Sequence, residues 1–228
     1  MRRCRTTYKS YSTMKNRFDL IIFDWDGTLV DSVDWIVHCI QTAAARHDCP
    51  VPDTQSAKDI IGLSIENAID TLFPGIDTET RQKLAADYGQ TFFSKAISPD
   101  DLFPGVRGML QSFRQRGYRL AIATGKKSSG LARAIAGTGI ADLFCTTRCA
   151  DQTASKPDPL MIDEIVAELG ICKQRTLMVG DSAHDMQMAL NAQVAAIAVT
   201  CGAHSAQVLQ QYQPLRCLQQ PTELADII

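Results

Sequence analysis

The chain has 228 residues, of which 45% are hydrophobic and 21% charged, and its formal net charge is -2. This length allows one large domain, or one domain with a modest insertion. The near-neutral charge gives no broad basic surface for nucleic acid or an anionic membrane, and no apolar run is long enough to span a bilayer, so we expect a soluble protein that binds neither.

Residues 1–17 form a basic, hydroxyl-rich stretch that contains no acidic residue. It lacks the apolar segment of a secretory signal, although its composition is compatible with a transit peptide or with an unstructured extension. Met14 would also serve as an initiator residue. We interpret 1–17 as an N-terminal extension, and we expect its first thirteen residues to be disordered and to have no catalytic role.

The first predicted strand covers 18–23 and ends in an acidic turn, Asp24-Trp25-Asp26-Gly27. A continuous apolar run of this length is typical of a strand that is buried on both faces. Two carboxylates that are two residues apart can both face the edge of the sheet if the chain turns there, and Gly27 permits the turn. The pattern predicts functional side chains at the carboxyl end of this strand.

The segment 31–98 contains no convincing strand. Helical patterns occur at 33–46, 65–72 and 78–95, with prolines between them. We predict an α-helical cap (31–98) inserted after the first strand of a core that comprises 18–30 and 99–228. The two connections, 29–32 and 98–105, would form a hinge if they lie close together.

Strands and helices alternate in the rest of the chain. Apolar runs predict strands at 118–123, 143–146, 176–179 and 195–199, and helical patterns occur at 126–137, 158–169, 185–192 and 205–212. Strands that alternate with helices of this length indicate an α/β fold with a parallel sheet covered on both faces. Polar residues at the strand ends then converge on one edge of the sheet, where such folds bind ligands.

Three further polar groups lie after predicted strands or in nearby loops. Thr124 and Gly125 supply a hydroxyl and exposed backbone amides at a helix start, which suits phosphate. Lys156 is a lone lysine between Ser155 and Pro157, just before a helix. A last segment, from Gly180-Asp181 to Asp185, again places acidic residues after a strand.

Together these residues predict phosphoryl chemistry. A carboxylate such as Asp24 attacks phosphorus only when cations neutralise the negative charge of the ester. Thr124, Gly125 and Lys156 would bind the phosphoryl oxygens. Asp26 would protonate the leaving oxygen and then activate water against a phospho-aspartate.

The remaining acidic residues suit a metal ion. Asp24 and Asp181, with Asp185 in support, would provide the hard oxygen ligands that Mg²⁺ prefers. His184, inside the same segment, is interpreted as a surface or supporting residue and not as a ligand. Lys126 and Lys127 would either add positive potential near the phosphate or simply begin a helix.

The eight cysteines show no Cys-x-x-Cys pair and no histidines at zinc-binding spacing. Disulfide frameworks are typical of small secreted chains that lack a core. We interpret all eight as structural or incidental thiols, which indicates a reducing compartment, most simply the cytoplasm.

These motifs, in this order, resemble those of the haloacid dehalogenase superfamily from residue 18 to the C-terminus. The resemblance implies a Rossmann-like parallel sheet core with a mobile cap. It further implies that Asp24, the backbone carbonyl of Asp26 and Asp181 ligate Mg²⁺, with Asp185 in support. The cap position and the segment Gly62-Leu63-Ser64-Ile65-Glu66 resemble the phosphoglycolate phosphatase-like branch. Many relatives carry Asn where this chain has Gly125, so contacts from an Asn side chain would be absent.

Several alternatives remain open at this stage. Asp26 argues against dehalogenation and against carbon–phosphorus cleavage, because relatives with those activities usually lack it. A phosphoglucomutase-type transfer uses the same core and stays open. A catalytically silent binding protein would lack some of the catalytic residues, whereas this chain has a suitable residue at every one of these positions. The expected partner is a small-molecule phosphate ester (phosphoglycolate, a sugar phosphate or a nucleoside monophosphate), and the protein would be a monomer or a homodimer.

Overall fold

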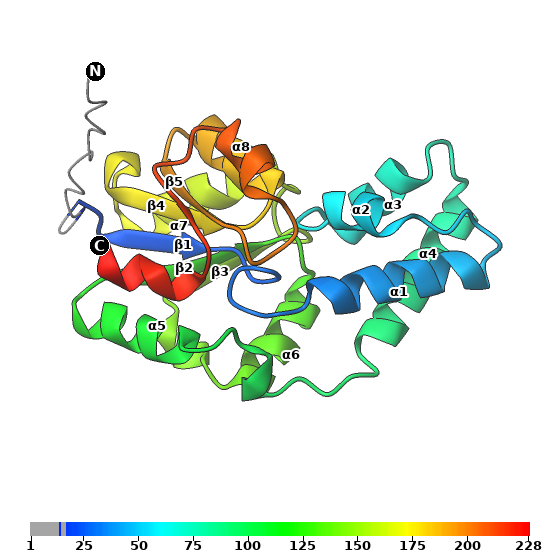
Figure 1. The fold of residues 1–228 in the computed structure, drawn as a ribbon, viewed down its shortest axis with the longest axis horizontal. Coiled ribbons are helices and arrows are strands. Elements are labelled where there is room, and N and C mark those ends of the chain that lie inside the picture. The colour runs from blue at the N-terminus through cyan, green and yellow to red at the C-terminus, as the bar shows by residue number, and fades with distance from the viewer. Residues whose placement is uncertain (1–13, 15–16) are drawn as a thin grey trace, which may run out of the picture.

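The computed structural model describes Met14 and residues 17–228, so the expectation for residues 1–13 lies outside the described part of the chain. Six parallel strands form one sheet in the order β3-β2-β1-β4-β5-β6 (Figure 1). The strands are β1 (Leu20–Phe23), β2 (Arg119–Thr124), β3 (Thr146–Cys149), β4 (Thr176–Gly180), β5 (Ala195–Val199) and β6 (Cys217–Leu218). The carboxyl ends of β1, β2 and β4 are therefore neighbours at one edge of the sheet.

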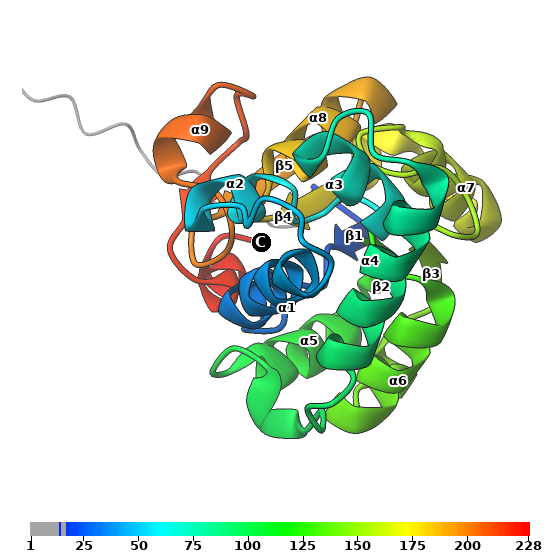
Figure 2. The ribbon, with the colours of Figure 1, turned by 90° about the vertical axis from the view of Figure 1, so that its right-hand side faces the viewer.

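Helices cover both faces of this sheet, as the alternating pattern predicted. The core helices are α5 (Val106–Gln115), α6 (Ser128–Thr138), α7 (Leu160–Leu169), α8 (Ala183–Ala192) and α9 (Ala206–Gln210), with 3₁₀ turns η1 (Pro99–Asp101), η2 (Ala141–Leu143), η3 (Lys173–Arg175) and η4 (Pro221–Asp226). Figure 2 shows α5 and α6 on one side of the strands and α7 and α8 on the other. The prediction of an α/β fold with a Rossmann-like parallel core is confirmed.

The strand β1 is buried on both faces, which explains its continuous apolar run. Ile21 and Phe23 pack in the hydrophobic cluster that contains α5 and α6, whereas Leu20 and Ile22 pack in the cluster of α7 and α8. All four side chains are fully buried. Because alternate residues of a strand point to opposite faces, a central strand in this fold needs apolar residues at every position.

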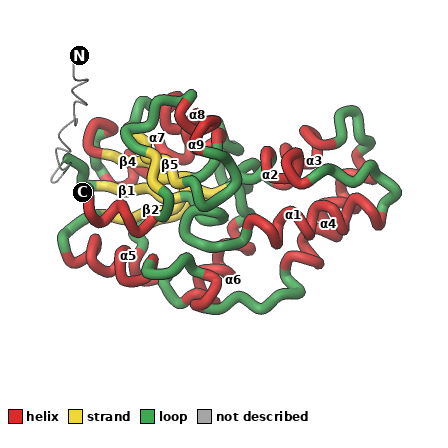
Figure 3. Tube along the Cα trace, in the orientation of Figure 1, coloured by secondary structure: helices red, strands yellow, loops and turns green. Residues whose placement is uncertain are grey.

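The cap consists of four helices inserted between β1 and α5. They are α1 (Val33–Arg46), α2 (Thr54–Asp59), α3 (Ile65–Leu72) and α4 (Thr78–Phe92), and they lie beyond the carboxyl ends of the strands (Figure 3). The side chains of Asp53, Ser64 and Asp77 accept hydrogen bonds from backbone N–H groups three residues on, so each begins a helix. Ile36 and Ile40 of α1 pack against Ile60 in the centre of the cap.

The two connections between core and cap lie side by side. Asp31 N donates to Asp101 O at 2.9 Å, and Phe103 N donates to Leu29 O at 3.0 Å. Val30 and Leu102 form an antiparallel bridge between them. This pairing is what a two-strand hinge requires, whereas the residue limits 31–98 for the cap stay a prediction.

Some predicted elements are shifted or were missed. The strand predicted at 143–146 begins only at Thr146, because Leu143 belongs to the turn η2 and its side chain packs in the core. The helix predicted over 78–95 ends at Phe92. Helices α2 and α5 and the short strand β6 were not predicted, although Val106, Met109, Leu110 and Phe113 show the i, i+3, i+4, i+7 spacing of a helix buried on one face.

Two further expectations concern residues 17–228. Within that range no helix combines the length and the apolarity needed to cross a membrane. The seven cysteines in that range are all free, which agrees with their interpretation as thiols.

Candidate active site

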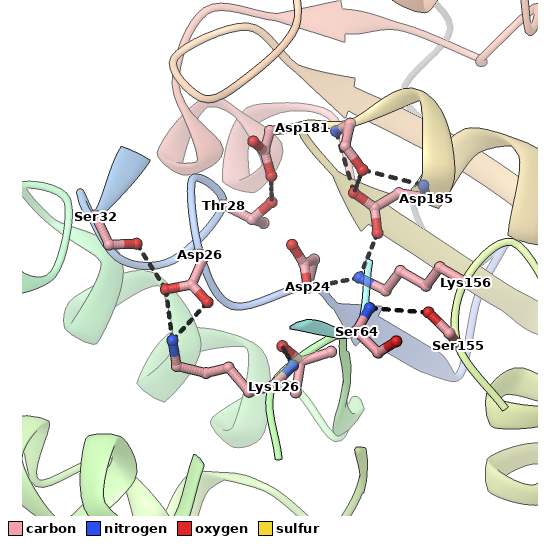
Figure 4. Close-up of polar contacts among 12 residues, drawn as sticks. Asp24, Asp26, Thr28, Ser32, Ser64, Lys126, Ser155, Lys156, Asp181 and Asp185 are labelled. Carbon is pink, nitrogen blue, oxygen red and sulfur yellow. Dashed lines mark hydrogen bonds and ion pairs between the residues drawn. The ribbon is translucent and has the colours of Figure 1, made fainter. Parts of the chain in front are cut away.

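Side chains from three neighbouring strand ends meet at the edge of the sheet that faces the cap. Asp24 follows β1, Thr124 is the last residue of β2, and Asp181 follows β4. Asp24 N donates to Val179 O at 2.9 Å, which continues the β1–β4 ladder up to the acidic turn. Figure 4 shows Asp24, Asp181, Asp185 and Lys156 pointing toward a common centre.

Lys156 lies between two carboxylates. Its Nζ donates to Asp24 Oδ1 at 2.6 Å and to Asp185 Oδ1 at 2.6 Å, and all three side chains are almost completely shielded from solvent. The second oxygen of the nucleophile candidate, Asp24 Oδ2, is buried and has no hydrogen-bond partner. A buried carboxylate oxygen without a partner is costly, so its retention here points to a ligand.

Asp181 and Asp185 are held by neighbouring donors. Asp181 Oδ1 accepts from Thr28 Oγ1 at 2.7 Å, and its Oδ2 accepts from Ala203 N at 2.7 Å. Asp185 Oδ2 accepts from Ser182 Oγ at 2.6 Å and from Ser182 N at 3.1 Å, in a capping box at the start of α8. Both carboxylates are therefore fixed before any ligand arrives.

Glycines allow the chain to approach Asp181 this closely. Gly27 has a φ of 75°, and a Cβ there would lie 2.2 Å from Asp181 Oδ2. A Cβ on Gly202 would lie 2.1 Å from the same oxygen. Side chains at either position would displace the carboxylate, which accounts for Gly27 in the acidic turn in addition to its turn geometry.

The electrostatics of the centre favour a bound cation. Burial raises the pKa of Asp24 well above its ordinary value, Lys156 opposes this, and the charges of Asp185 and Asp181 add to it. Burial, reinforced by Asp185, raises the pKa of Asp181 to about 7. Burial disfavours the Lys156 charge, but Asp185 and Asp24 outweigh it and raise the lysine pKa above its ordinary value. Three carboxylates thus face one ammonium group, an imbalance that a cation would relieve.

The geometry also fits a metal ion. Among residues 17–228, Asp24, Asp181 and Asp185 are the group of acidic side chains whose oxygens come within 4.8 Å of one another. All three are buried, and hard carboxylate oxygens are the ligands that Mg²⁺ prefers. The carboxylate of Asp24, which has an oxygen without a hydrogen-bond partner, belongs to this group. The residues present therefore suit a small divalent cation.

The side chain of Asp26 lies apart from this cluster. Its carboxylate accepts from Ser32 Oγ at 2.7 Å and from Lys126 Nζ at 2.7 and 3.0 Å. The same ammonium group lies 4.2 Å from the ring centroid of Phe92, a residue of the cap. Lys126 therefore does more than begin a helix, because its ammonium contacts both a predicted catalytic residue and the cap, whereas positive potential near the phosphate stays a prediction.

The loop after β2 lies against the cap. Thr124 is buried, and its Oγ1 accepts from Lys126 N at 3.3 Å. A Cβ on Gly125 would lie 2.3 Å from Leu63 O and 2.4 Å from Gly62 O. The departure from Asn at this position thus has a physical reason, because backbone of the cap fills the space that a side chain would need.

Comparison with known proteins identifies the family. The family model for haloacid dehalogenase-like hydrolases matches residues 21–199 of the sequence, and this range includes every predicted site residue. The chain belongs to this family. A probable phosphatase, IndB of Dickeya dadantii, is 34% identical over 199 residues, which cover 86% of each chain. The phosphoglycolate phosphatase of Pasteurella multocida is 28% identical over 82% of this chain and 87% of its own.

A solved structure of a haloacid dehalogenase-like hydrolase from Bacteroides fragilis superposes with a TM-score of 0.82 at 25% identity, and covers 91% of this chain and 99% of its own. These findings make the chain a phosphatase-type hydrolase, as the sequence motifs predicted. The fold that brings Asp24, Lys156 and Asp181 together is therefore one that solved hydrolase structures share. The individual roles of these side chains stay predictions.

For two residues of this hydrolase, the sequence did not reveal the contact that each makes at the site. Lys126 was left between two interpretations, because a lysine at a helix start is common and its partner Asp26 lies 100 residues away. The backbone N–H of Ser64, in the cap, donates to Ser155 Oγ at 2.9 Å and so joins the cap to the loop that carries Lys156. His184, as expected, is not in the carboxylate cluster; its Nε2 lies 2.9 Å from Asp59 O in the cap.

Proposed function

We propose that this hydrolase cleaves a small phosphate monoester through a phospho-aspartate on Asp24, with Mg²⁺ as cofactor. The observation that carries the proposal is Asp24 Oδ2. It is a buried oxygen without a hydrogen-bond partner, on a carboxylate whose other oxygen is held by Lys156 at 2.6 Å. One oxygen is thus fixed and the other is available to attack phosphorus.

The two steps follow from the residues around this oxygen. In the first step Asp24 Oδ2 forms a bond to phosphorus, the bond to the ester oxygen breaks, and Asp26 gives that oxygen its proton. In the second step Asp26 takes a proton from water, the water oxygen bonds to phosphorus, and phosphate leaves with Asp24 restored. Ser32 and Lys126 hold the Asp26 carboxyl group in place for both transfers.

The cluster of Asp24, Asp181 and Asp185 would hold the metal, with Asp181 fixed by Thr28 and by the amide of Ala203. When bound, Mg²⁺ supplies positive charge that offsets the negative charges of the carboxylates and the phosphoryl group. Lys156 supplies further positive charge at the same place. Thr124 and the amides that follow it would contact the phosphoryl oxygens.

The cap limits the substrate to a small molecule. The cavity beside Asp24, Asp26 and Thr124 lies between core and cap and has a volume of about 160 Å³. A folded phosphoprotein could not insert its phosphorylated residue without opening the hinge, so we expect metabolite-sized esters to be preferred.

Release of inorganic phosphate from p-nitrophenyl phosphate tests the proposal. We expect turnover with Mg²⁺, none with EDTA, and a loss on the order of 10⁴-fold in Asp24→Asn. The matched control is Asp142→Asn, an exposed carboxylate in η2, which should keep full activity. Wild-type turnover by Asp24→Asn would contradict the mechanism, and transfer of phosphate to a second sugar phosphate in preference to water would favour the mutase alternative.

A further inference from the structure

The cavity under the cap has an apolar wall. Ile36 and Ile40 from α1, Ile65 from α3, and Tyr88 and Phe92 from α4 line it opposite Asp24 and Thr124 (the arrangement of these helices is seen in Figure 2). None of the cap residues that line the cavity is charged. The part of a substrate that points away from the phosphate therefore meets hydrocarbon and aromatic surface.

The cations near this cavity are already neutralised. Lys126 Nζ is bound to Asp26 at 2.7 Å and lies over the Phe92 ring. Lys127 Nζ pairs with Glu66 of the cap at 2.7 Å. A second anionic group on the substrate, such as a carboxylate or another phosphate, would have to break the shielded Lys126–Asp26 pair, compete with Glu66 for the half-exposed Lys127, or remain unpaired against apolar side chains. The first and the last of these are unfavourable.

One polar group on the cap side is uncommitted. The hydroxyl of Tyr88 has no hydrogen-bond partner among the described residues, while its ring packs against Phe92 with centroids 5.8 Å apart. The cavity can thus accept one uncharged polar substituent on an otherwise apolar group.

The volume sets the size of that group. A dry cavity of about 150 Å³ lined by Leu, Ile and Phe side chains accommodates one benzene molecule. The volume here, about 160 Å³, is similar, and the cap side of the lining is also apolar, whereas the core side carries Asp24, Thr124 and Lys126. The phosphoryl group would occupy the end of this volume beside Asp24 and Thr124, so one six-membered ring is the upper limit for the organic group, and two fused rings exceed the space unless the cap opens.

We propose that the organic part of the substrate is uncharged, largely apolar and about the size of one six-membered ring, as in an arylmethyl phosphate. This inference rests on the proposed phosphatase function and narrows its substrate class. It disfavours phosphoglycolate, whose carboxylate would lie against the apolar wall formed by Ile36, Ile40 and Ile65.

A substrate series tests the inference. Benzyl phosphate, ethyl phosphate and 2-phosphoglycolate release alcohols, which avoids the activated leaving group of a phenol. We expect kcat/KM for benzyl phosphate to exceed that for ethyl phosphate by about tenfold or more, since apolar contacts discriminate by this order. The value for 2-phosphoglycolate should be lower than both, and 2-naphthylmethyl phosphate should be poorer than benzyl phosphate.

A variant that fills part of the cavity tests whether the preference for benzyl phosphate arises there. Ala85 on α4 lines the cavity, whereas its neighbour Ala86 is exposed. Ala85→Leu should lower kcat/KM for benzyl phosphate by about tenfold and change that for ethyl phosphate by less than about threefold. Ala86→Leu should leave both values unchanged. If Ala85→Leu does not fold, inhibition of the wild-type enzyme decides, with benzylphosphonate expected to compete at lower concentration than phosphonoacetate.

The outcomes separate the two proposals. If 2-phosphoglycolate or a sugar phosphate gives a higher kcat/KM than benzyl phosphate, the substrate inference is overturned while the phosphatase mechanism stands. If no ester is hydrolysed in an Asp24-dependent manner, both are overturned. A preference for benzyl phosphate that Ala85→Leu removes and Ala86→Leu retains supports the inference.

Discussion

Lys156 Nζ contacts Asp24 Oδ1 at 2.6 Å and leaves Asp24 Oδ2 without a hydrogen-bond partner. The lysine thus fixes the orientation of the carboxylate and determines which of its oxygens remains available. Both side chains are shielded from solvent, and they lie 132 residues apart in the chain. The site therefore depends on the loop that carries Lys156 as much as on the acidic turn after β1.

Removing this ammonium group should be costly. Lys156→Met would leave Asp24 and Asp185 buried without their shared partner, so we expect a loss of about 3–5 kcal/mol in the free energy of unfolding, together with loss of activity. Urea denaturation with EDTA present measures the first effect. The matched control is Lys173→Met, since Lys173 forms a half-exposed pair with Asp163 that should contribute about 1 kcal/mol or less. Equal stabilities of the two variants would argue against a central role for Lys156.

Lys126 should affect catalysis more than stability. Lys126→Met removes the ammonium group that contacts Asp26 but keeps a side chain against Phe92. Because a misplaced catalytic group can reduce turnover by about 100-fold, we expect kcat to fall by roughly 10- to 100-fold. The comparison is Lys127→Met, which loses only a half-exposed pair with Glu66 and should change kcat by less than about threefold. Steady-state kinetics on one ester measure both variants. An unchanged kcat in Lys126→Met would show that Lys126 does not position Asp26 for catalysis.

Gly125 should control closure of the cap. In Gly125→Ala the new Cβ would lie 2.3 Å from Leu63 O, so the cap loop must move away. We expect a loss of kcat of about tenfold or more, because the lining of the site would no longer meet the core. Small-angle scattering should show a more open molecule.

A second glycine serves as the control for that experiment. A Cβ on Gly108 in α5 would meet no atom within 4 Å, so Gly108→Ala should keep full activity and stabilise the protein by about 0.5–1 kcal/mol through helix propensity. A Gly125→Ala protein with wild-type kcat and dimensions would show that the cap tolerates a side chain there.

The stability of the fold should depend on pH through Asp101, which lies in the hinge. Burial would raise the pKa of this carboxyl, but the hydrogen bonds from Lys95 Nζ and Ser98 N outweigh it and hold the pKa below its ordinary value. A carboxyl whose pKa is lower in the folded state stabilises the fold above its unfolded pKa of about 3.9, and this contribution is lost as the pH falls through the folded value.

Asp101→Asn should therefore be less stable than the wild type at pH 7, and the difference should shrink below about pH 4. Urea denaturation across this range measures it. Asp100→Asn, at the exposed neighbouring position, serves as the control. A stability gap that is constant with pH would mean that the Asp101 charge is not involved.

Much of the fold was readable from local patterns. The continuous apolar run of β1 predicted a strand buried on both faces, since each face of a central strand packs against helices. The alternation after residue 117 predicted the parallel sheet. The start of β3 was misplaced because Leu143 and Phe144 are as apolar as strand residues, yet Leu143 lies in a 3₁₀ turn that packs on the same core. Local hydrophobicity does not distinguish these two ways of burying a side chain.

The sequence by itself determined the acidic turn, the loop lysine and the second pair of acidic residues, because each follows an element that its own residues define. Only the tertiary structure decided that Asp24 Oδ2 is left without a partner, that Lys126 binds Asp26, and that cap backbone fills the space beside Gly125. These contacts join segments that are far apart in the chain. Their distances are set by how the cap packs on the edge of the sheet, which no local pattern of residues encodes.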